Sequence, residues 1–337
     1  MLDLETVQTN EPRRRRGGKL IYLLPVVTLL FVLSSIRLPY FVLRPGPAKD
    51  VETLIHISHH QTFPSRGHML LTSVSYYRPN AYQAFGAWLD PAESVVPERD
   101  LQAPGQSQKQ EFQQALSQMD TSKIDAAVVA LTRYAGYPAS HGPGLLVEDV
   151  FDKTPAQGKI FPGDLITKVD GKAVDDPDQL GATIRAAGVG HPLAFTIQAG
   201  GKTRLVSVAP AKLPDVDHPV IGVSLVNNFP FPLTIESGSI GGPSAGLMWT
   251  LGMVDLLTPG DLTDGRTIAG TGAITAEGKV LPIGGIQEKV VAAERAGATI
   301  FFVPVKDEAG ARSVAKKITL VPVKTYLDAV AYLQRLG

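Results

Sequence analysis

Ser244 lies where a glycine-rich loop runs directly into an apolar stretch. The segment reads Ser-Gly-Ser-Ile-Gly-Gly-Pro-Ser-Ala-Gly-Leu-Met-Trp from residue 237, and its apolar continuation predicts a helix that begins near Ser244. The first backbone N–H groups of a helix have no partner within it, and the positive end of the helix dipole favours negative charge. A serine here can act as a nucleophile, and the backbone N–H groups around Gly242 to Ser244 are candidate oxyanion donors.

Lys289 lies in a second segment, Thr267 to Val305, whose pattern predicts a strand, a hairpin, a glycine pair, a helix and a strand. Gly284-Gly285 opens the predicted helix 286–296, which is mostly apolar around Lys289. A lysine on such a helix commonly keeps its ammonium group in water. If it is buried instead, desolvation lowers its pKa, and the neutral amine can take the proton of a serine hydroxyl. Spacing alone does not choose between these readings.

The motifs GGPSAG and TGAITAEGKVLPIGGIQEKVVAAERAG closely resemble the proteolytic domain of Lon-type (S16) serine proteases, over about residues 215–337. The resemblance implies that Ser244 is the nucleophile, that Lys289 is the general base and that Thr271 contacts and orients the lysine. Ala273 departs from the pattern, because many Lon sequences have a glutamate there, and this affects fine tuning rather than the dyad. Lon-type domains often form hexameric rings, so the resemblance also implies self-association.

Residues 138–212 are predicted to form a separate β-rich domain. The run VEDVFDKTPAQGKIFPGDLITKVDGKAV resembles a PDZ domain of the kind found in bacterial proteases. PDZ domains bind an extended peptide by adding it as a strand to a sheet edge. The resemblance implies that Gly144, Leu145 and Leu146 receive the carboxylate and backbone of the peptide.

The N-terminal residues predict a membrane anchor. Residues 1–19 contain four consecutive arginines, and residues 20–36 carry no charge and are mostly Leu, Val, Ile and Phe. As a helix, the uncharged run spans roughly 25 Å, a little less than the hydrocarbon core of about 30 Å, and Tyr22 and Tyr40 could lie near its two interfaces. The positive-inside rule makes residues 1–19 a cytoplasmic tail and places everything after Arg37 outside. A cleaved signal peptide is the alternative, disfavoured by the lack of an A-x-A-like site. The predicted location is the cell membrane, crossed once.

Residues 45–137 are predicted to be an extracytoplasmic region of mixed α/β structure. Strands are expected at 51–58 and 69–77, and helices at 108–118 and 122–134. This region contains four histidines, His56, His59, His60 and His68. Their spacing matches no ligand motif, so ordinary surface or strand histidines are preferred over a metal site. No metal ion and no cofactor is predicted.

Composition limits the function classes open to the chain. It has 337 residues, of which 44% are hydrophobic and 19% charged, so the length favours several domains that can each bury a core. Lys+Arg and Asp+Glu both number 32, which leaves no basic field to attract nucleic acid. Cysteine is absent, which excludes disulfides, thiolate metal sites and a cysteine nucleophile. The predicted fold class is an α/β (α+β) multidomain protein with an N-terminal transmembrane helix.

The order anchor, N-terminal region, PDZ domain and Lon-type domain resembles the membrane-anchored PDZ–Lon proteases of Gram-positive bacteria, which lack an AAA+ ATPase module. No Walker motif occurs in the sequence. The pattern predicts an ATP-independent serine endopeptidase that cleaves extracytoplasmic or membrane-associated proteins, recognised partly through extended or C-terminal segments. Two alternatives are a non-catalytic PDZ adaptor at the membrane and a small-molecule kinase with a phosphate-binding loop. The presence of both Ser244 and Lys289 disfavours them.

Overall fold

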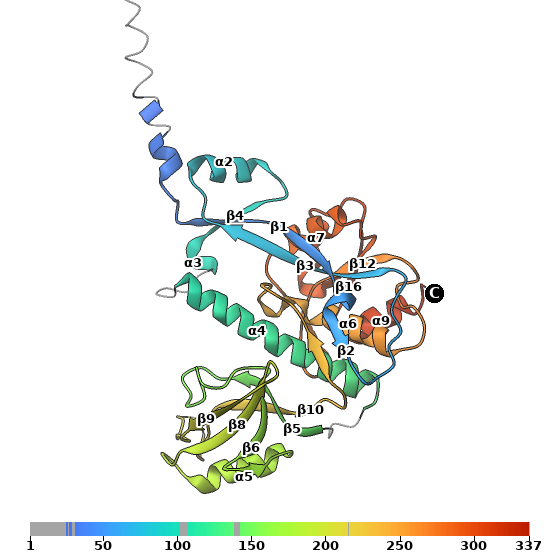
Figure 1. Cartoon of the computed structure of the whole chain (residues 1–337). Helices are drawn as coiled ribbons and strands as arrows, with labels where there is room; N and C mark the ends of the chain where they lie inside the picture. The colour runs from blue at the N-terminus through green and yellow to red at the C-terminus, as the bar shows by residue number, and fades with distance from the viewer. Residues whose placement is uncertain are drawn as a thin grey trace, which may run out of the picture.

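The computed structural model of the chain describes Pro25 and residues 27–28, 31–101, 107–137, 142–214 and 216–336. These residues form a larger body and, below it in Figure 1, a smaller one, each built around its own sheet. The predicted tail 1–19 lies outside the described residues, as do residues 20–24, 26 and 29–30 of the predicted anchor. No helix among the residues that were searched is both long and apolar enough to span a membrane.

A six-stranded mixed sheet forms the centre of the larger body. In spatial order its strands are β16 (Thr319–Val323), β15 (Ile300–Pro304), β12 (Thr267–Gly270), β3 (His68–Tyr77), β1 (Tyr40–Asp50) and β4 (Ser94–Pro97). The first four strands run parallel, and β1 is antiparallel to both of its neighbours. The long antiparallel pair of β1 and β3 thus lies next to the parallel half of the sheet.

This sheet joins two ranges that the sequence predicts as separate units. β1, β3 and β4 come from residues 45–137 and the residues just before them, whereas β12, β15 and β16 come from 215–337. The pairing of Leu71 with Gly270 connects the two. Residues 45–137 are therefore part of the same body as the Lon-like segment. The backbone groups on one edge of β3 find their partners in β12, a strand distant in the sequence.

Helices cover both faces of the sheet. One face is covered by α6 (Gly246–Leu257) and α9 (Tyr326–Leu333), with α4 (Gln108–Val128) and its π-helical continuation η2 (Val129–Tyr134) packed on α6. The other face is covered by α7 (Ile286–Arg295) and α8 (Glu308–Arg312). Side chains alternate along β3, because Met69 and Leu71 join the α6 side and Leu70 joins the α7 side. The two helices expected within 108–134 form one continuous helical segment.

The smaller body is a β-rich domain inserted into the larger one. Its strands, in spatial order, are β10 (Val223–Asn228), β5 (Gly142–Val150), β6 (Leu165–Val169), β8 (Leu193–Ala199) and β9 (Lys202–Val208), and β7 (Lys172–Ala173) also pairs with β6. Helix α5 (Pro177–Ala187) packs on the sheet, and its N-cap Asp176 accepts hydrogen bonds from two backbone N–H groups. The sheet extends beyond the predicted end at 212, because β10 supplies its last strand.

Short elements complete the larger body. They are η1 (Glu52–Leu54), β2 (Ile55–Ile57), α2 (Ala81–Leu89), α3 (Glu98–Leu101), β11 (Leu233–Ile235), η3 (Pro243–Ala245), β13 (Ala273–Ile274), β14 (Val280–Leu281) and η4 (Val305–Asp307). β11 pairs with β2, so the chain leaves the larger body after η2 and rejoins it directly after the inserted domain.

Candidate active site

Ser244 lies in the single turn η3, directly before the twelve-residue helix α6. Gly242 begins the turn with φ +87°, a conformation that favours glycine. Gly246 then allows a close approach, because a Cβ there would lie 2.7 Å from Ile274 Cγ2 and 2.8 Å from Ser122 Oγ. The glycines around the serine therefore place it against the first turn of α6, as the sequence predicts.

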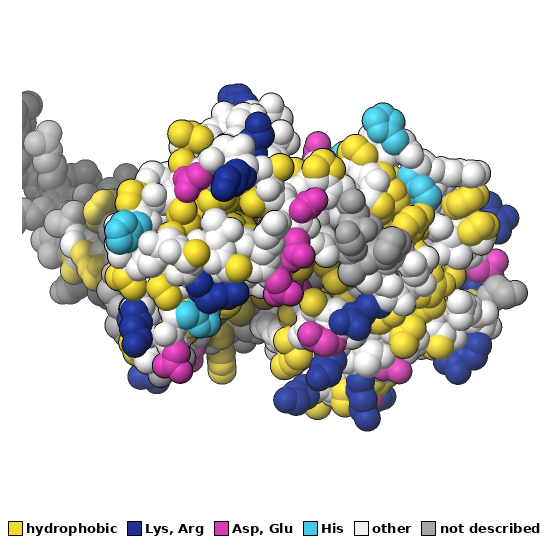
Figure 2. Space-filling view, turned by 90° about the horizontal axis from the view of Figure 1, so that it is seen from below, with side chains coloured by type: hydrophobic (Ala, Val, Ile, Leu, Met, Phe, Trp, Pro, Cys, Tyr) yellow, Lys and Arg dark blue, Asp and Glu magenta, His cyan; other side chains and the backbone are white. Residues whose placement is uncertain are grey.

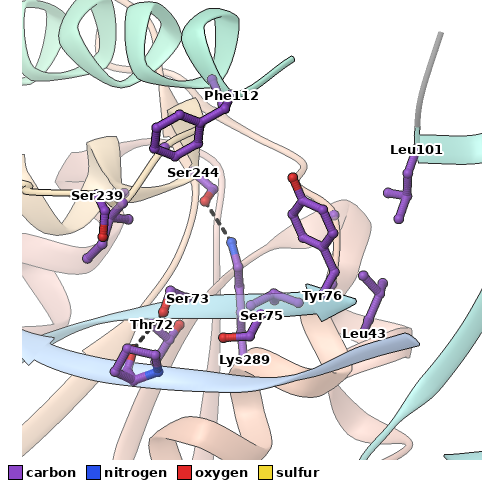
Figure 3. Close-up of a pocket in the computed structure, with 18 residues that line it drawn as sticks. Leu43, Thr72, Ser73, Ser75, Tyr76, Leu101, Phe112, Ser239, Ser244 and Lys289 are labelled. Carbon is purple, nitrogen blue, oxygen red and sulfur yellow. Dashed lines mark hydrogen bonds between the residues drawn. The ribbon is translucent and has the colours of Figure 1, made fainter. Parts of the chain in front are cut away.

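Lys289 reaches Ser244 from the opposite side of the site. It lies on the first turn of α7, and its Nζ is 2.7 Å from Ser244 Oγ (Figure 3). Only 4% of Lys289 is exposed, so its ammonium group does not reach bulk water. Of the two readings that the sequence left open, the structure has the buried lysine rather than the snorkelling one.

Burial lowers the pKa of Lys289 from 10.5 to about 8, because desolvation disfavours the ammonium form. The negative charges of Asp307 and Glu288 oppose this effect and keep the pKa from falling further. The result is an amine that is partly neutral near pH 7, which is the condition for a general base.

Thr271 fixes both members of the pair. Its hydroxyl accepts a hydrogen bond from Lys289 Nζ at 3.2 Å and donates one to the backbone oxygen of Ser244 at 3.0 Å. Its backbone N–H donates to Phe302 O at 3.0 Å, which anchors it to strand β15. The sequence-predicted residues Ser244, Lys289 and Thr271 therefore meet within hydrogen-bond distance of one another.

The predicted oxyanion donors fare differently. The N–H group of Gly242 donates to the backbone oxygen of Ala115 at 2.7 Å, on helix α4. An N–H that is already used cannot also bind an oxyanion without losing that bond. In this conformation Gly242 therefore has no free N–H for an oxyanion, contrary to the prediction. The first N–H at the start of the helix that is expected to be free is that of Ser244.

A cleft of about 450 Å³ opens beside Ser244. Figure 3 looks into it, with β1 and β3 on one side and α4 on the other. Its lining is mostly apolar and includes Leu43, Tyr76, Leu101, Phe112 and Ile240. The cleft is large enough for one bulky side chain together with neighbouring backbone.

The edge of β3 forms the floor of this cleft. β12 pairs with β3 only as far as Leu71, so within the described chain no strand pairs with residues 72–76 on that side. Residues 72–76 all line the cleft. Their other edge is occupied by β1. An open strand edge next to a nucleophile can receive an extended peptide by main-chain hydrogen bonds.

Helix α4 is a part of the site that sequence reasoning missed. Phe112 and Ala115 line the cleft, and Ser122 Oγ donates to Pro243 O at 2.9 Å, next to the nucleophile. Gly241 approaches α4 closely, since a Cβ there would lie 2.8 Å from Ala115 Cβ. The helical spacing of 108–134 was readable, but nothing local in the sequence indicates that this helix packs on a loop more than a hundred residues away.

The histidines of the N-terminal region do not form a cluster of ligands. Among the residues described and searched, no group of three or more His, Cys, Asp or Glu could hold a metal ion. His60 stacks on Phe231 with ring centroids 4.5 Å apart, and its Nε2 lies 2.9 Å from the Tyr137 hydroxyl. His68 Nδ1 lies 2.7 Å from an oxygen of Asp50.

The predicted peptide-binding residues of the inserted domain, Gly144, Leu145 and Leu146, lie on its central strand β5. Leu145 and Leu146 pair with β10 on one side and with β6 on the other, so no edge is free there to receive a peptide. This prediction is corrected by the sheet order, which makes β10 the edge strand. The sequence signal that was missed is the run Val-Ile-Gly-Val at residues 220–223, which leads into β10 and lies after the predicted end of the domain.

A groove of about 410 Å³ lies between β10 and α5. Ile184 and Gly181 of α5 form one wall, and Val223 and Leu225 of β10 form the other. Arg185 and His218 line the groove, and Arg185 can supply positive charge for a carboxylate.

Two domain families match parts of the chain. Residues 233–332 match the Lon protease (S16) C-terminal proteolytic domain, and residues 118–209 match the PDZ domain. The Lon protease of Mycoplasma genitalium is 39% identical over 114 residues, which are 32% of this chain and 14% of that protein. The Lon protease of Dictyoglomus thermophilum is 34% identical over 128 residues, which are 37% of this chain and 15% of that protein.

Among solved structures, the PDZ domain of an SdrC-like protein from Listeria monocytogenes is 28% identical. The match covers 24% of this chain and 86% of that one, with a TM-score of 0.23, which adds nothing to the family match. The matched stretches span 14% and 15% of the two Lon relatives above. The chain contains the proteolytic domain of an S16 serine peptidase, together with a PDZ domain.

Proposed function

We propose that the chain is an ATP-independent serine endopeptidase in which Ser244 is the nucleophile and Lys289 the general base. The observation that carries this proposal is the buried Lys289 Nζ at 2.7 Å from Ser244 Oγ. Burying this lysine costs desolvation energy, which the charges of Asp307 and Glu288 repay only in part, so its place beside a hydroxyl fits a general base better than a structural role.

In the proposed reaction the neutral amine of Lys289 accepts the proton of Ser244 Oγ as this oxygen attacks the scissile carbonyl carbon. The negative charge on the carbonyl oxygen is stabilised by the Ser244 N–H and by the positive end of the α6 dipole. The Lys289 ammonium then gives its proton to the leaving amine, and an acyl group remains on Ser244. Water attacks the acyl group with Lys289 again as base, which releases the product and restores the serine.

The substrate of this proposal is an extended polypeptide. The open edge of β3 at residues 72–76 can pair with a peptide strand and present its carbonyl to Ser244. A folded protein cannot supply such a strand, because its backbone groups are already paired. The apolar walls at Phe112, Ile240 and Tyr76 favour an apolar side chain next to the cleaved bond.

The PDZ domain is proposed to bind the C-terminal segment of a substrate. The groove between β10 and α5 combines a free strand edge, apolar walls and the cationic side chain of Arg185. Such a groove fits an apolar C-terminus, whose backbone extends the sheet and whose carboxylate meets positive charge. Recruitment here raises the local concentration of the substrate at the protease body.

The anchor at residues 20–36 is likewise part of the proposal. It rests on the uncharged apolar run and the four arginines that precede it. With the arginines in the cytoplasm, the cleft and the PDZ groove face the outside of the cell membrane. Substrates would then be extracytoplasmic or membrane-associated proteins.

Cleavage of casein, an unfolded protein, tests the proposal. The full chain is purified in detergent, because a fragment beginning at residue 45 would lose half of β1. Wild type is compared with Ser244→Ala and Lys289→Ala in the absence of ATP. We expect wild type to cleave, and both variants to be inactive with unchanged circular dichroism. A folded wild type that binds C-terminal peptides but does not cleave would favour the adaptor instead, and full activity of Lys289→Ala would refute the dyad.

A further inference from the structure

In helix α2 (Ala81–Leu89) the buried residue is an alanine, whereas the large apolar side chains are exposed. Its sequence, Ala-Tyr-Gln-Ala-Phe-Gly-Ala-Trp-Leu, contains no charge. Its buried residue is Ala87, whereas Phe85 is 61% exposed, Trp88 74% and Leu89 61%. A helix that packs on a soluble body does the reverse, because burying the large apolar side chains is what stabilises it. The apolar face of α2 therefore points away from the body.

The residues that precede the sheet hold α2 in place. Asn80, its N-cap, donates from its side chain to Ser34 O at 3.0 Å. Arg37 donates to Arg78 O and to Gln83 Oε1, both at 3.1 Å. Leu38 N–H donates to Pro79 O at 2.9 Å. These bonds fix α2 beside the end of the uncharged run 20–36, as Figure 1 shows at the top of the molecule.

The end of that run is also exposed and apolar. Phe31 is 70% exposed and Ile36 54%. We call Phe31, Ile36, Phe85, Trp88 and Leu89 the apolar patch. Phe85 and Trp88 lie with ring centroids 6.2 Å apart, so these two aromatic side chains of α2 are neighbours on the surface.

The side of the molecule away from α2 has a different character. Figure 2 views that side, and Lys, Arg, Asp and Glu are interspersed there with apolar side chains. Soluble monomers rarely expose a contiguous patch of large apolar residues without a partner for it. The apolar patch thus calls for a partner.

We propose that α2 is an interfacial helix that lies in the surface of a lipid bilayer, beside the membrane anchor. This inference rests on the proposed anchor. The bilayer is the partner that fits, because the patch includes Phe31 and Ile36 of the uncharged run, and because Trp88 and Tyr40 are residues that favour the membrane–water interface. Arg37 and Gln83 lie at the junction between α2 and the uncharged run and supply polar groups beside the apolar face.

A second contact with the bilayer would also set the height of the active site. Tyr76, which lines the cleft, and Ala81, which begins α2, are separated by five residues, at most about 18 Å even if fully extended. The part of the cleft at Tyr76 would then lie within about that distance of the membrane surface. Its substrates would be segments of chain that emerge close to the membrane.

Tryptophan fluorescence tests the inference in the full chain. The protein has two tryptophans, Trp88, which is exposed, and Trp249, which is 0% exposed. The chain is reconstituted into phosphatidylcholine–phosphatidylglycerol vesicles, with acyl chains either unmodified or brominated near the headgroup end. We expect bromine to quench the Trp88 emission at least about twofold, since interfacial helices bury their apolar face only about 5–10 Å deep. Trp88→Phe is the control, and its remaining Trp249 emission should not respond to bromine.

Flotation of the vesicles separates the inference from the anchor on which it rests. If the protein floats with the vesicles but Trp88 is not quenched, α2 does not lie in the bilayer, and the inference is overturned while the anchor stands. If the protein does not float, both are overturned. A second copy covering the patch would also overturn it, and Phe85→Cys detects this, because the chain has no other cysteine and a dimer would become disulfide-linked.

Discussion

Lys289 sets the pH dependence of the proposed reaction. Its pKa falls from 10.5 to about 8 because the ammonium group is desolvated. The difference corresponds to about 3 kcal/mol against the charged form. At pH 7 about a tenth of Lys289 is then the neutral base, compared with about 0.03% for an ordinary lysine. The buried site therefore increases the amount of active base roughly 300-fold.

The expected result is a kcat/KM that rises about tenfold per pH unit below pH 7 and levels off above pH 8. A matched perturbation is Asp307→Asn. The negative charge of Asp307 is the largest influence that keeps the Lys289 pKa from falling further, so its removal lowers that pKa and moves the inflection to lower pH. Asparagine retains an oxygen for the bond that Asp307 accepts from Ile283 N–H at 2.9 Å.

The assay is the initial rate of cleavage of a fluorogenic peptide with an apolar residue before the cleaved bond, from pH 6 to 9.5. Circular dichroism at each pH checks that the protein stays folded. An inflection near pH 8 that moves down in Asp307→Asn supports the buried base. A rate that does not change over this range, or an inflection that moves up in the variant, would refute the reasoning.

Three further predictions concern single residues. Thr271→Ala should lower kcat/KM about tenfold by releasing Lys289, and Thr271→Ser should restore most of it, as measured by the same peptide assay. Lys289→Met should abolish cleavage but raise the melting temperature by several degrees at pH 7. Because the folded-state pKa of Lys289 lies below the unfolded value, the cost of the buried ammonium is fully present below pH 8 and disappears as pH rises toward 10.5. The difference in melting temperature between Lys289→Met and wild type, followed by thermal unfolding, should therefore shrink over that window. Gly285→Ala should destabilise the protein by about 1–3 kcal/mol, since Gly285 has φ +67° and a Cβ would lie 2.7 Å from Val74 Cγ2. The control Gly284→Ala, with open space around the added Cβ, should unfold at a denaturant concentration similar to that of wild type.

The proposed pair of Ser244 and Lys289 was predictable because its signals are local. The glycines around Ser244 and the glycine pair before α7 specify tight turns and helix starts, and the structure has both. The buried state of Lys289 was not predictable from spacing, since it depends on the packing of α7 against β1 and β3 and on the turn at Ser244, which belong to other parts of the chain.

The rest of the site depends on pairings between distant segments. β3 was expected as a strand at 69–77, but its pairing with β12 joins regions that look like separate domains in the sequence. The PDZ groove was misplaced for a related reason. The edge strand β10 follows the recognisable part of the domain, so the motif alone indicated β5, which is paired on both sides.

The most direct test of the central claim is detection of an acyl-enzyme on Ser244. Wild type is mixed with a peptide ester that has an apolar residue at the acyl position, the reaction is stopped in acid, and the intact mass and the modified peptide are determined by mass spectrometry. We expect a mass increase equal to the acyl group, located on the peptide that contains Ser244, absent in Ser244→Ala and formed far more slowly in Lys289→Met. Cleavage that proceeds with the acyl group on another residue, or undiminished in Ser244→Ala, would contradict the Ser244–Lys289 account.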